Sequence, residues 1–167
     1  MNKIIEFLGI IPARGGSKRL HRKNIQKICG KELIYYSINA SKNSRLLNKT
    51  IFSTEDLEIA QVAKNHGAND IHIRPRDLAG DSITNIEVIK FYLEKFDKEL
   101  NLSVKNIVLL QPTSPLRTHN DIDNAIKIFI NSNLPTLASV TGPYKKRHPV
   151  LMYRNFSSNI NQMSPLE

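Results

Sequence analysis

The sequence predicts an α/β fold in which a mostly parallel sheet is flanked by helices. Short apolar runs alternate with amphipathic stretches of helical periodicity along the chain, and this alternation is typical of βαβ units. The 167 residues, of which 40% are hydrophobic, are also enough for one domain with a substantial core. We therefore expect a single domain over 1–167.

Five short segments are predicted to be strands. Residues Phe7–Ile11 form a continuous apolar run that Pro12 closes, and such a run is typical of a parallel strand that is buried on both faces. A second run of the same kind is NIVLL, at Asn106–Leu110. The remaining candidates are Thr50–Ser53, Asp70–Arg74 and Thr136–Val140.

Four stretches are predicted to be helices: Leu33–Leu47, a segment between Ser53 and Gly67, Ile83–Phe96 and Asp121–Ile130. In the third of these, apolar residues recur at three- and four-residue spacing. The second is expected to end at Gly67 and to be capped by Ser53 or Thr54. Glu55 and Asp56 follow that cap and suit the positive end of a helix dipole.

Polar segments follow four of the predicted strands at their carboxyl ends: ARGGSK, STED, RP and QPTSPLR. In open α/β sheets, ligands bind beyond the carboxyl ends of the strands. The sequence therefore predicts a binding site at this edge of the sheet, to which all four segments contribute.

The first of these segments opens an unusually basic stretch. Between Arg14 and Lys31 there are seven Lys or Arg residues and no Asp or Glu, and unpaired charges are expensive to bury. Gly15 and Gly16 allow close backbone approach and positive φ angles, and their successive N–H groups can form a nest for an anion. The stretch therefore predicts a cradle for a polyanion; the alternative is a surface turn with solvated charges.

The chemistry of the cations fits phosphate. Arg14 can bind phosphate oxygens in a bidentate manner, whereas Lys18 and Lys23 can act as point charges. The stretch is neither a Walker loop, GxxxxGK[ST], nor the dinucleotide motif GxGxxG. The motif is therefore of another type, and its position after a predicted strand favours the binding interpretation.

The formal net charge of +9 raises the alternative of a nucleic-acid-binding protein. The chain has no Trp, and its basic cluster is local and not interleaved with aromatic residues, so a pocket for a small anion requires fewer assumptions. No apolar run approaches the roughly 20 residues of a membrane-spanning helix. We therefore expect neither a nucleic-acid partner nor a membrane. Cys29 is the only cysteine, which fits a cytoplasmic protein with a buried thiol.

The stretch IIPARGGSKRLHRKNI resembles the signature of the acylneuraminate cytidylyltransferases, the CMP-sialic acid synthetase family, whose usual form is PARxGSKxxxxKN. Three further stretches are similar in order and spacing: IFSTEDLEIAQVAKNHGA, RPRDLAGDS and LLQPTSPLR. The resemblance covers the chain from about Ile4 to Pro149 and implies a Rossmann-like nucleotidyltransferase fold. It also implies transfer of CMP from CTP to a nonulosonic acid with release of pyrophosphate, Mg²⁺ as cofactor, and a role in cell-surface polysaccharide biosynthesis. Arg19 and His21 depart from the family, in which Gly and Pro are commoner at these positions.

The resemblance further implies the residues of the site. The triphosphate would be held by seven residues of the basic stretch: Arg14, Gly15, Gly16, Ser17, Lys18, Lys23 and Asn24. Three of them would neutralise charge on the leaving pyrophosphate and so count as catalytic: Arg14, Lys18 and Lys23. Arg74, Asp81 and Ser82 would face cytosine and its ribose. Gln111, Thr113 and Ser114 would lie beside the sugar acid, and Arg117 would either hold their turn or meet a carboxylate. The metal ligands stay unassigned.

The resemblance also implies a distal segment that supplies paired aspartates for the metal and part of a dimer interface. Neither is recognisable before Glu167. We therefore expect a cytidylyltransferase that can form a homodimer, with two alternatives: a CTP-binding module of the same fold that does not turn over, and a basic nucleic-acid-binding protein.

Overall fold

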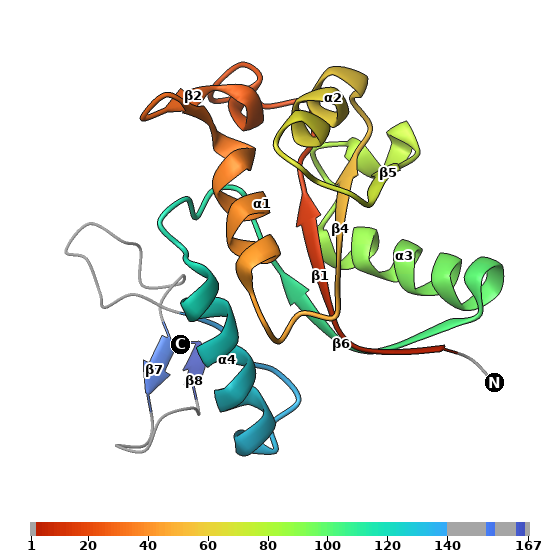
Figure 1. The fold of residues 1–167 in the computed structure, drawn as a ribbon, viewed down its shortest axis with the longest axis vertical. Helices are drawn as coiled ribbons and strands as arrows, with labels where there is room; N and C mark the ends of the chain where they lie inside the picture. The colour runs from red at the N-terminus through yellow and green to blue at the C-terminus, as the bar shows by residue number, and fades with distance from the viewer. Residues whose placement is uncertain (1–2, 140–152, 156–162, 166–167) are drawn as a thin grey trace. The chain divides into compact units, whose positions relative to one another are not determined.

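The structure is a computed structural model that describes residues 3–139, 153–155 and 163–165 (Figure 1). The chain divides into two compact units, 1–124 and 125–167. The first unit holds a four-stranded sheet, and the second holds the antiparallel pair β7 (Tyr153–Asn155) and β8 (Met163–Pro165). The single domain over 1–167 stays a prediction.

The central sheet is parallel throughout, with the order β5-β4-β1-β6. Its strands are β1 (Lys3–Pro12), β4 (Lys49–Thr54), β5 (Ile71–Ile73) and β6 (Leu102–Leu109). The chain runs outwards from β1 to β4 and β5, and then crosses back to β6 on the other side of β1. The strand order therefore reverses between β1 and β6, which is where open α/β sheets form a ligand crevice. The predicted α/β class is confirmed.

The helices cover both faces of the sheet. Because crossovers between parallel strands are right-handed, the reversal places α3 (Asn85–Leu100) on the opposite face from α1 (Leu33–Asn43) and α2 (Leu57–Asn65), as Figure 1 shows. On the α3 face, strand residues pack against buried residues of the helix, and together they form one core cluster: Ile5, Leu8, Ile10, Ile51, Val88, Tyr92 and Phe96. This core fixes the strand ends relative to the start of α3.

Several helix boundaries differ from the sequence prediction. The prediction that Ser53 or Thr54 caps α2 was wrong: both belong to β4 and are fully buried, and Asp56 is the cap, because its carboxylate accepts the N–H groups of Glu58 and Ile59. The end of α1 comes at Asn43, before the predicted Leu47.

The early end of α1 has a structural cause. Asp123, in the first turns of α4 (His119–Ser132), accepts hydrogen bonds from Ser44 Oγ at 2.5 Å and from the Arg45 and Leu46 N–H groups. These bonds satisfy donors that a longer helix would otherwise use. At the other boundary, α3 begins with a capping box between Thr84 and Glu87 and continues to Leu100, beyond the predicted Phe96.

The strand predicted at Thr136–Val140 is wrong over its described part. Residues 136–139 are irregular, whereas Val140 lies outside the described residues. No strand among the described residues pairs with this segment, and an unpaired strand would leave its backbone polar groups without partners in the protein. The strand propensity of these residues is therefore not sufficient to make them a strand.

A short hairpin escaped the sequence prediction. Strands β2 (Lys27–Ile28) and β3 (Lys31–Glu32) pair antiparallel, and Cys29 and Gly30 form the two-residue turn with φ of 49° and 81°. Positive φ at both central residues is the geometry of a type I′ turn, which suits a tight hairpin. Cys29 is consequently exposed, and the prediction of a buried thiol was wrong.

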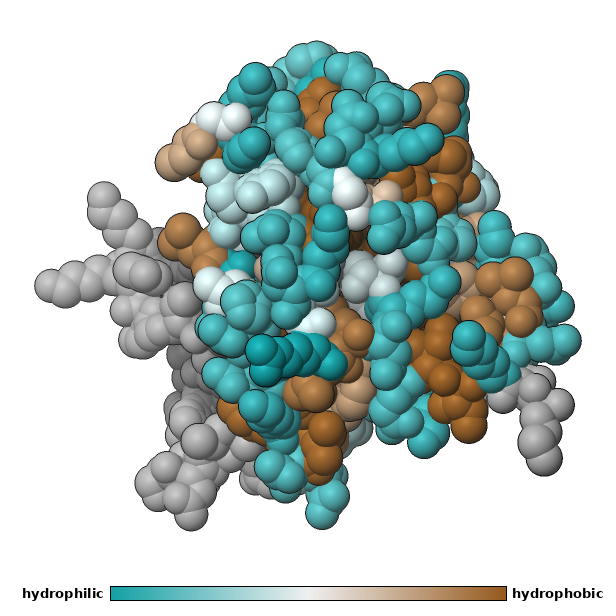
Figure 2. All heavy atoms as spheres, in the orientation of Figure 1, coloured by the Kyte–Doolittle hydropathy of each residue, from teal (hydrophilic) through white to brown (hydrophobic). Residues whose placement is uncertain are grey.

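Several large hydrophobic side chains are exposed, among them Leu57, Ile86 and Leu116. On the face drawn in Figure 2, brown hydrophobic patches are separated by hydrophilic residues. Within the described residues, no helix combines the length and the apolar character that crossing a bilayer requires.

Candidate functional site

A cavity of about 460 Å³ opens in the first unit. Its walls come from the ends of β1 and β6, the basic stretch after β1, Arg74 and the segment leading into α3. The lining residues are Pro12, Arg14, Ser17, Lys23, Asn24, Arg74, Leu78, Ala79, Gly80, Asp81, Ile83, Thr84, Asn85, Val88, Gln111, Pro112 and Thr113. The cavity therefore lies at the reversal of strand order, where the fold predicts a ligand.

The sheet ladder fixes the backbone from which the site residues project. One residue beyond each strand, the Ala13 N–H donates to Ser53 O, the Arg74 N–H to Thr54 O and the Leu110 N–H to Ile10 O, all within 2.9 Å. Arg14 and Gln111 follow directly after two of these bonded residues. The sheet therefore fixes the backbone at Arg14 and Gln111, and the loops that begin there carry the polar side chains of the site.

Arg14 and Lys18 share one carboxylate. The Arg14 guanidinium lies 3.1 Å from Asp81 Oδ1 and also donates to the Gly80 carbonyl, and Lys18 Nζ lies 2.8 Å from Asp81 Oδ2. The hydrogen bond from Lys18, together with the charge of Arg14, holds the pKa of the Asp81 carboxyl below its ordinary value. Asp81 therefore occupies an anion position between two of the predicted phosphate-binding cations.

Lys23 and Asn24 contribute differently. Asn24 is buried and its Nδ2 donates to the Arg14 carbonyl at 2.8 Å, so it fixes the backbone that carries Arg14. Lys23 begins the 3-10 helix η1 (Lys23–Ile25), lines the cavity and forms no ion pair with a described residue. Its ammonium is thus a cavity cation that no described carboxylate neutralises.

Gly15, but not Gly16, is required for a steric reason and not for the φ angle that we predicted. Among the described glycines, only Gly30 and Gly67 have positive φ, so the expected positive φ angles at Gly15 and Gly16 were wrong. At Gly15 the requirement is steric, because a Cβ there would lie 2.6 Å from Asp56 Oδ2, whereas a Cβ at Gly16 would meet nothing within 4 Å. The Gly15 N–H already donates to Glu55 Oε1 at 2.6 Å.

Arg74 is the most deeply buried cation of the cavity wall, with 3% of its side chain exposed. Its Nη2 donates to Glu55 Oε2 at 3.1 Å, and its Nη1 donates to Ser53 Oγ, which also accepts the Tyr92 hydroxyl. Burial raises the pKa of Tyr92, so the hydroxyl stays a donor. The sequence analysis assigned Glu55 only to the start of a helix. No local pattern distinguishes a carboxylate at a helix start from one that binds groups of two different loops.

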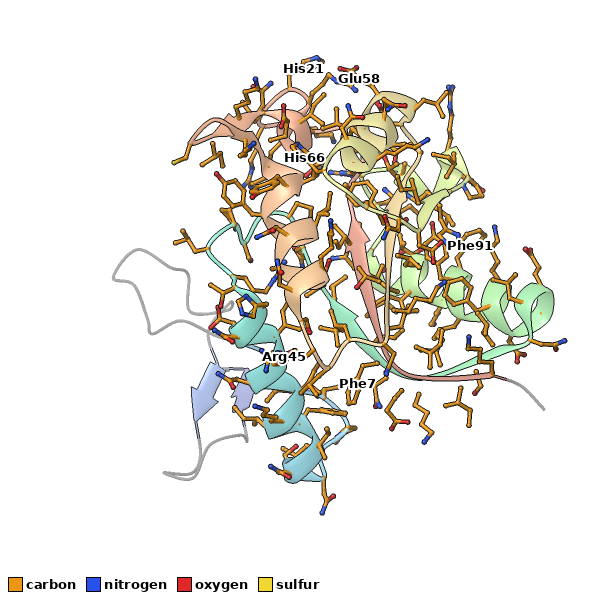
Figure 3. The ribbon with its side chains drawn as sticks, in the orientation of Figure 1. Phe7, His21, Arg45, Glu58, His66 and Phe91 are labelled. Carbon is orange, nitrogen blue, oxygen red and sulfur yellow. The ribbon has the colours of Figure 1, made fainter. Side chains whose placement is uncertain are left out.

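The middle of the basic stretch is tied to α2. Arg22 Nη2 lies 2.9 Å from both Asp56 Oδ1 and Glu58 Oε2, and the neighbouring His21 and Glu58 are labelled in Figure 3, where the stretch approaches this helix. Burial alone would raise the pKa of Asp56, but hydrogen bonds from Arg22 and the helix N–H groups lower it overall. The exposed segment between Gly15 and Arg22 is therefore held at both ends by carboxylates.

The wall after β6 is a turn whose shape Arg117 maintains. Arg117 Nη2 donates to Ser37 Oγ at 2.8 Å and to the Gln111 carbonyl at 3.1 Å, and burial lowers the pKa of this guanidinium. Of the two roles left open for Arg117, holding the turn is the one that the structure displays. Gln111 and Thr113 line the cavity, whereas Ser114 does not.

Other predicted residues also lie outside the cavity lining: Gly15, Gly16, Lys18, Ser82 and Arg117. Conversely, the structure adds Thr84 and Asn85, which bring the N-terminus of α3, and its partial positive charge, to the cavity wall. The capping-box pattern Thr84-x-x-Glu87 is readable in the sequence and could have located this helix start.

The described residues do not provide a metal centre of their own. They contain no group of three or more His, Cys, Asp or Glu side chains placed to hold an ion. Asp81 is the sole carboxylate among the residues that line the cavity, and each of its oxygens is engaged by a cation. These residues therefore do not fit a protein-ligated metal site.

Comparison with known proteins identifies the family. A family model described as "Cytidylyltransferase" matches residues 8–162. The chain belongs to this cytidylyltransferase family. Among curated proteins, the chain is 38% identical to a CMP-N,N'-diacetyllegionaminic acid synthase of Legionella pneumophila, over 74% of this chain and 53% of that protein. It is 35% identical to a pseudaminic acid cytidylyltransferase of Campylobacter jejuni, over 80% of this chain and 57% of that protein.

Another curated relative and a solved structure are also similar to this cytidylyltransferase-family chain. An N-acylneuraminate cytidylyltransferase of Escherichia coli is 36% identical over 74% of this chain and 28% of that protein. A solved structure of CMP:2-keto-3-deoxy-manno-octonic acid synthetase complexed with CTP matches with a TM-score of 0.60 at 21% identity, over 78% of this chain and 50% of that chain, which confirms the fold. The chain spans about half the length, or less, of the curated relatives named here.

Proposed function

We propose that the chain binds CTP in the cavity and transfers CMP from it to a nonulosonic acid, with release of pyrophosphate. The observation that carries this proposal is that Arg14, Lys23 and Arg74 line one cavity at the reversal of strand order, together with Gln111 and Thr113. Three relatives are named for the legionaminic, pseudaminic and N-acylneuraminic members of this acid class, which supports the acceptor.

Within this proposal, the basic stretch binds the triphosphate. Lys23 meets a phosphate directly, and Arg14 and Lys18 exchange Asp81 for phosphate oxygens. Arg74 and the 81–82 segment face the cytidine. The acceptor lies over Gln111 and Thr113, with Ser114 and Arg117 supporting the turn beneath it.

The reaction needs positioning and charge neutralisation more than covalent chemistry. The anomeric hydroxyl of the acid attacks the α-phosphorus of CTP and releases its proton to water, a new P–O bond forms, and pyrophosphate leaves with the electrons of the broken bond. Arg14, Lys18 and Lys23 neutralise the charge that develops on this leaving group. No covalent intermediate with the protein is required.

Mg²⁺ enters the proposal as part of the substrate, Mg–CTP. Mg²⁺ commonly binds through substrate phosphates and only one or two carboxylates, so the absence of a described metal cluster is compatible with this arrangement. The test is CTP affinity measured with and without Mg²⁺, with EDTA as the control.

The decisive experiment has two stages. Calorimetry with CTP, and with ATP as the mismatched nucleotide, tests the cavity; preference for CTP is expected, and equal affinities would contradict the proposal. Pyrophosphate release is then measured with legionaminic, pseudaminic and N-acetylneuraminic acids. CTP binding without release on any acid would favour the alternative of a CTP-binding module that does not turn over.

A nucleic-acid-binding function is the second alternative, and salt dependence distinguishes it. Several phosphate contacts to a polynucleotide would make the affinity fall steeply with salt concentration; a flat response excludes this function. We also propose a cytoplasmic location and a homodimer, and light scattering of the purified chain tests the latter.

A further inference from the structure

We infer that Glu55 is a positioning residue, which joins the first turn of the basic stretch to Arg74 and so sets the shape of the cavity before nucleotide binds. This inference rests on the proposed function, because it treats the cavity as the nucleotide site. It assigns to Glu55 a role that is separate from the helix start.

Both carboxylate oxygens of Glu55 are engaged by groups from different loops. Oε1 accepts the Gly15 N–H at 2.6 Å, and Oε2 accepts Arg74 Nη2 at 3.1 Å. The side chains of Glu55 and Arg74 are 12% and 3% exposed. A largely buried carboxylate with two partners in fixed directions holds those partners rigidly.

The position of Glu55 in the fold explains this bridge. It follows β4, which lies between β1 and β5 in the sheet. A side chain at the end of β4 can therefore reach the loop after β1 on one side and the residue after β5 on the other. Gly15 and Arg74 stand in those two places.

Glu55 is not needed to begin α2. Asp56 accepts the free N–H groups of Glu58 and Ile59 and is the cap. The capping function is thus complete without Glu55, and the bridge is the role that its contacts support.

Loss of the bridge would change the cavity in two ways. Arg74 is buried and its Nε has no hydrogen-bond partner among the described residues, so without Glu55 it would be a buried charge with little compensation. The Gly15 N–H would also lose its acceptor, which frees the start of the basic stretch to move. Both changes lower the affinity for nucleotide by loosening groups that are otherwise preorganised.

The test compares Glu55→Gln, which preserves size, with the control Glu99→Gln, an exposed carboxylate near the end of α3 whose ion-pair partner Lys95 lies on the same helix. The glutamine NH₂ cannot accept from the Arg74 guanidinium, so one arm of the bridge is lost. We expect CTP to bind about tenfold more weakly to Glu55→Gln, as expected for a lost charge-assisted bond, and within about twofold of the original affinity to Glu99→Gln. Unchanged CTP affinity in Glu55→Gln would overturn the inference.

A double-mutant cycle separates positioning from general destabilisation. Because Glu55 acts through Arg74, Glu55→Gln should add less than about twofold to the loss caused by Arg74→Lys. Fully multiplicative losses, or a lower melting temperature with unchanged CTP affinity, would mean that Glu55 has only a structural role.

A measurement on the protein without nucleotide distinguishes failure of this inference from failure of the proposed function. In ¹⁵N NMR spectra, the Gly15 amide and the Arg74 side-chain signals should shift in Glu55→Gln and stay in place in Glu99→Gln. If those signals shift but the original chain binds no CTP, the bridge is real and the assignment of the cavity is wrong. If neither signal shifts, the bridge itself is refuted.

Discussion

Lys18 Nζ lies 2.8 Å from Asp81 Oδ2, and Arg14 engages the other oxygen of the same carboxylate at 3.1 Å. One side chain of the protein therefore stands where the proposal places a phosphate. A triphosphate must compete with Asp81 for both cations, so Asp81 lowers the affinity for the phosphate part of a ligand.

We predict that Asp81→Asn raises the affinity for inorganic triphosphate by about two- to fivefold, the range expected when exposed ion pairs of this kind are released. The probe is inorganic triphosphate because it lacks the cytidine that the 81–82 segment is proposed to face. Isothermal titration calorimetry measures the effect, with Asp77→Asn in the exposed η2 helix (Arg76–Ala79) as the control. Weaker binding to Asp81→Asn than to the original chain would contradict this prediction.

Lys23→Ala should weaken CTP binding by about 1–3 kcal/mol, the usual range for a hydrogen bond to a charged group. Lys23 lines the cavity and has no described ion-pair partner to release, so the loss falls on the ligand rather than on the fold. Lys27→Ala is the matched control, because Lys27 lies four residues away on the exposed β2 strand. Equal CTP affinities for the two variants would show that the basic stretch is assigned wrongly.

The two adjacent glycines should respond differently to the same substitution. Gly15→Ala places a methyl group 2.6 Å from Asp56 Oδ2, and overpacking of this kind costs about 1–3 kcal/mol of stability. Gly16→Ala meets no atom within 4 Å and should leave the free energy of unfolding within about 0.5 kcal/mol of the original. Urea denaturation of both variants measures the difference; equal stabilities would mean that Gly15 and Asp56 are farther apart than described.

Asp123 should make the stability depend on pH. Burial alone would raise its pKa, but the bonds from Ser44 and from the Arg45 and Leu46 N–H groups outweigh burial and lower the pKa below the ordinary value. A carboxyl whose folded pKa is depressed adds stability above its unfolded pKa, and that stability is lost as the pH falls through the folded pKa.

Asp123→Asn should therefore lower the free energy of unfolding by about 1–3 kcal/mol at neutral pH, because partly buried donors lose their charged acceptor. The difference between this variant and the original should shrink as the pH falls below about 4, where the carboxyl of the unfolded chain is protonated. Denaturation at several pH values measures it, with Asp97→Asn on α3 as an exposed control. A difference that does not vary with pH would contradict the assignment.

Much of the fold was predictable because its signals are local. The apolar runs of β1 and β6 and the periodicity of α3 are visible in the sequence, and polar segments at strand ends located the site edge. What escaped prediction depends on contacts between distant residues. Nothing near Glu55 indicates that its carboxylate reaches both Gly15 and Arg74, and nothing near Gly15 indicates that Asp56 is the side chain that a Cβ would strike.

Charge pattern alone also could not distinguish a cation that is neutralised from one that is available. Arg14, Lys18 and Arg22 all meet carboxylates that come from outside the basic stretch, whereas Lys23 meets none of those described. The sequence shows seven similar cations, and only the fold separates them.

The two-residue turn of the β2–β3 hairpin gives experiments on this protein a practical advantage. Its exposed sulfur belongs to the sole cysteine of the sequence, so a maleimide dye can be attached at one known position without removing any other thiol. That position follows η1 closely in the chain, which makes the fluorophore a reporter for movement of the basic stretch when nucleotide is added.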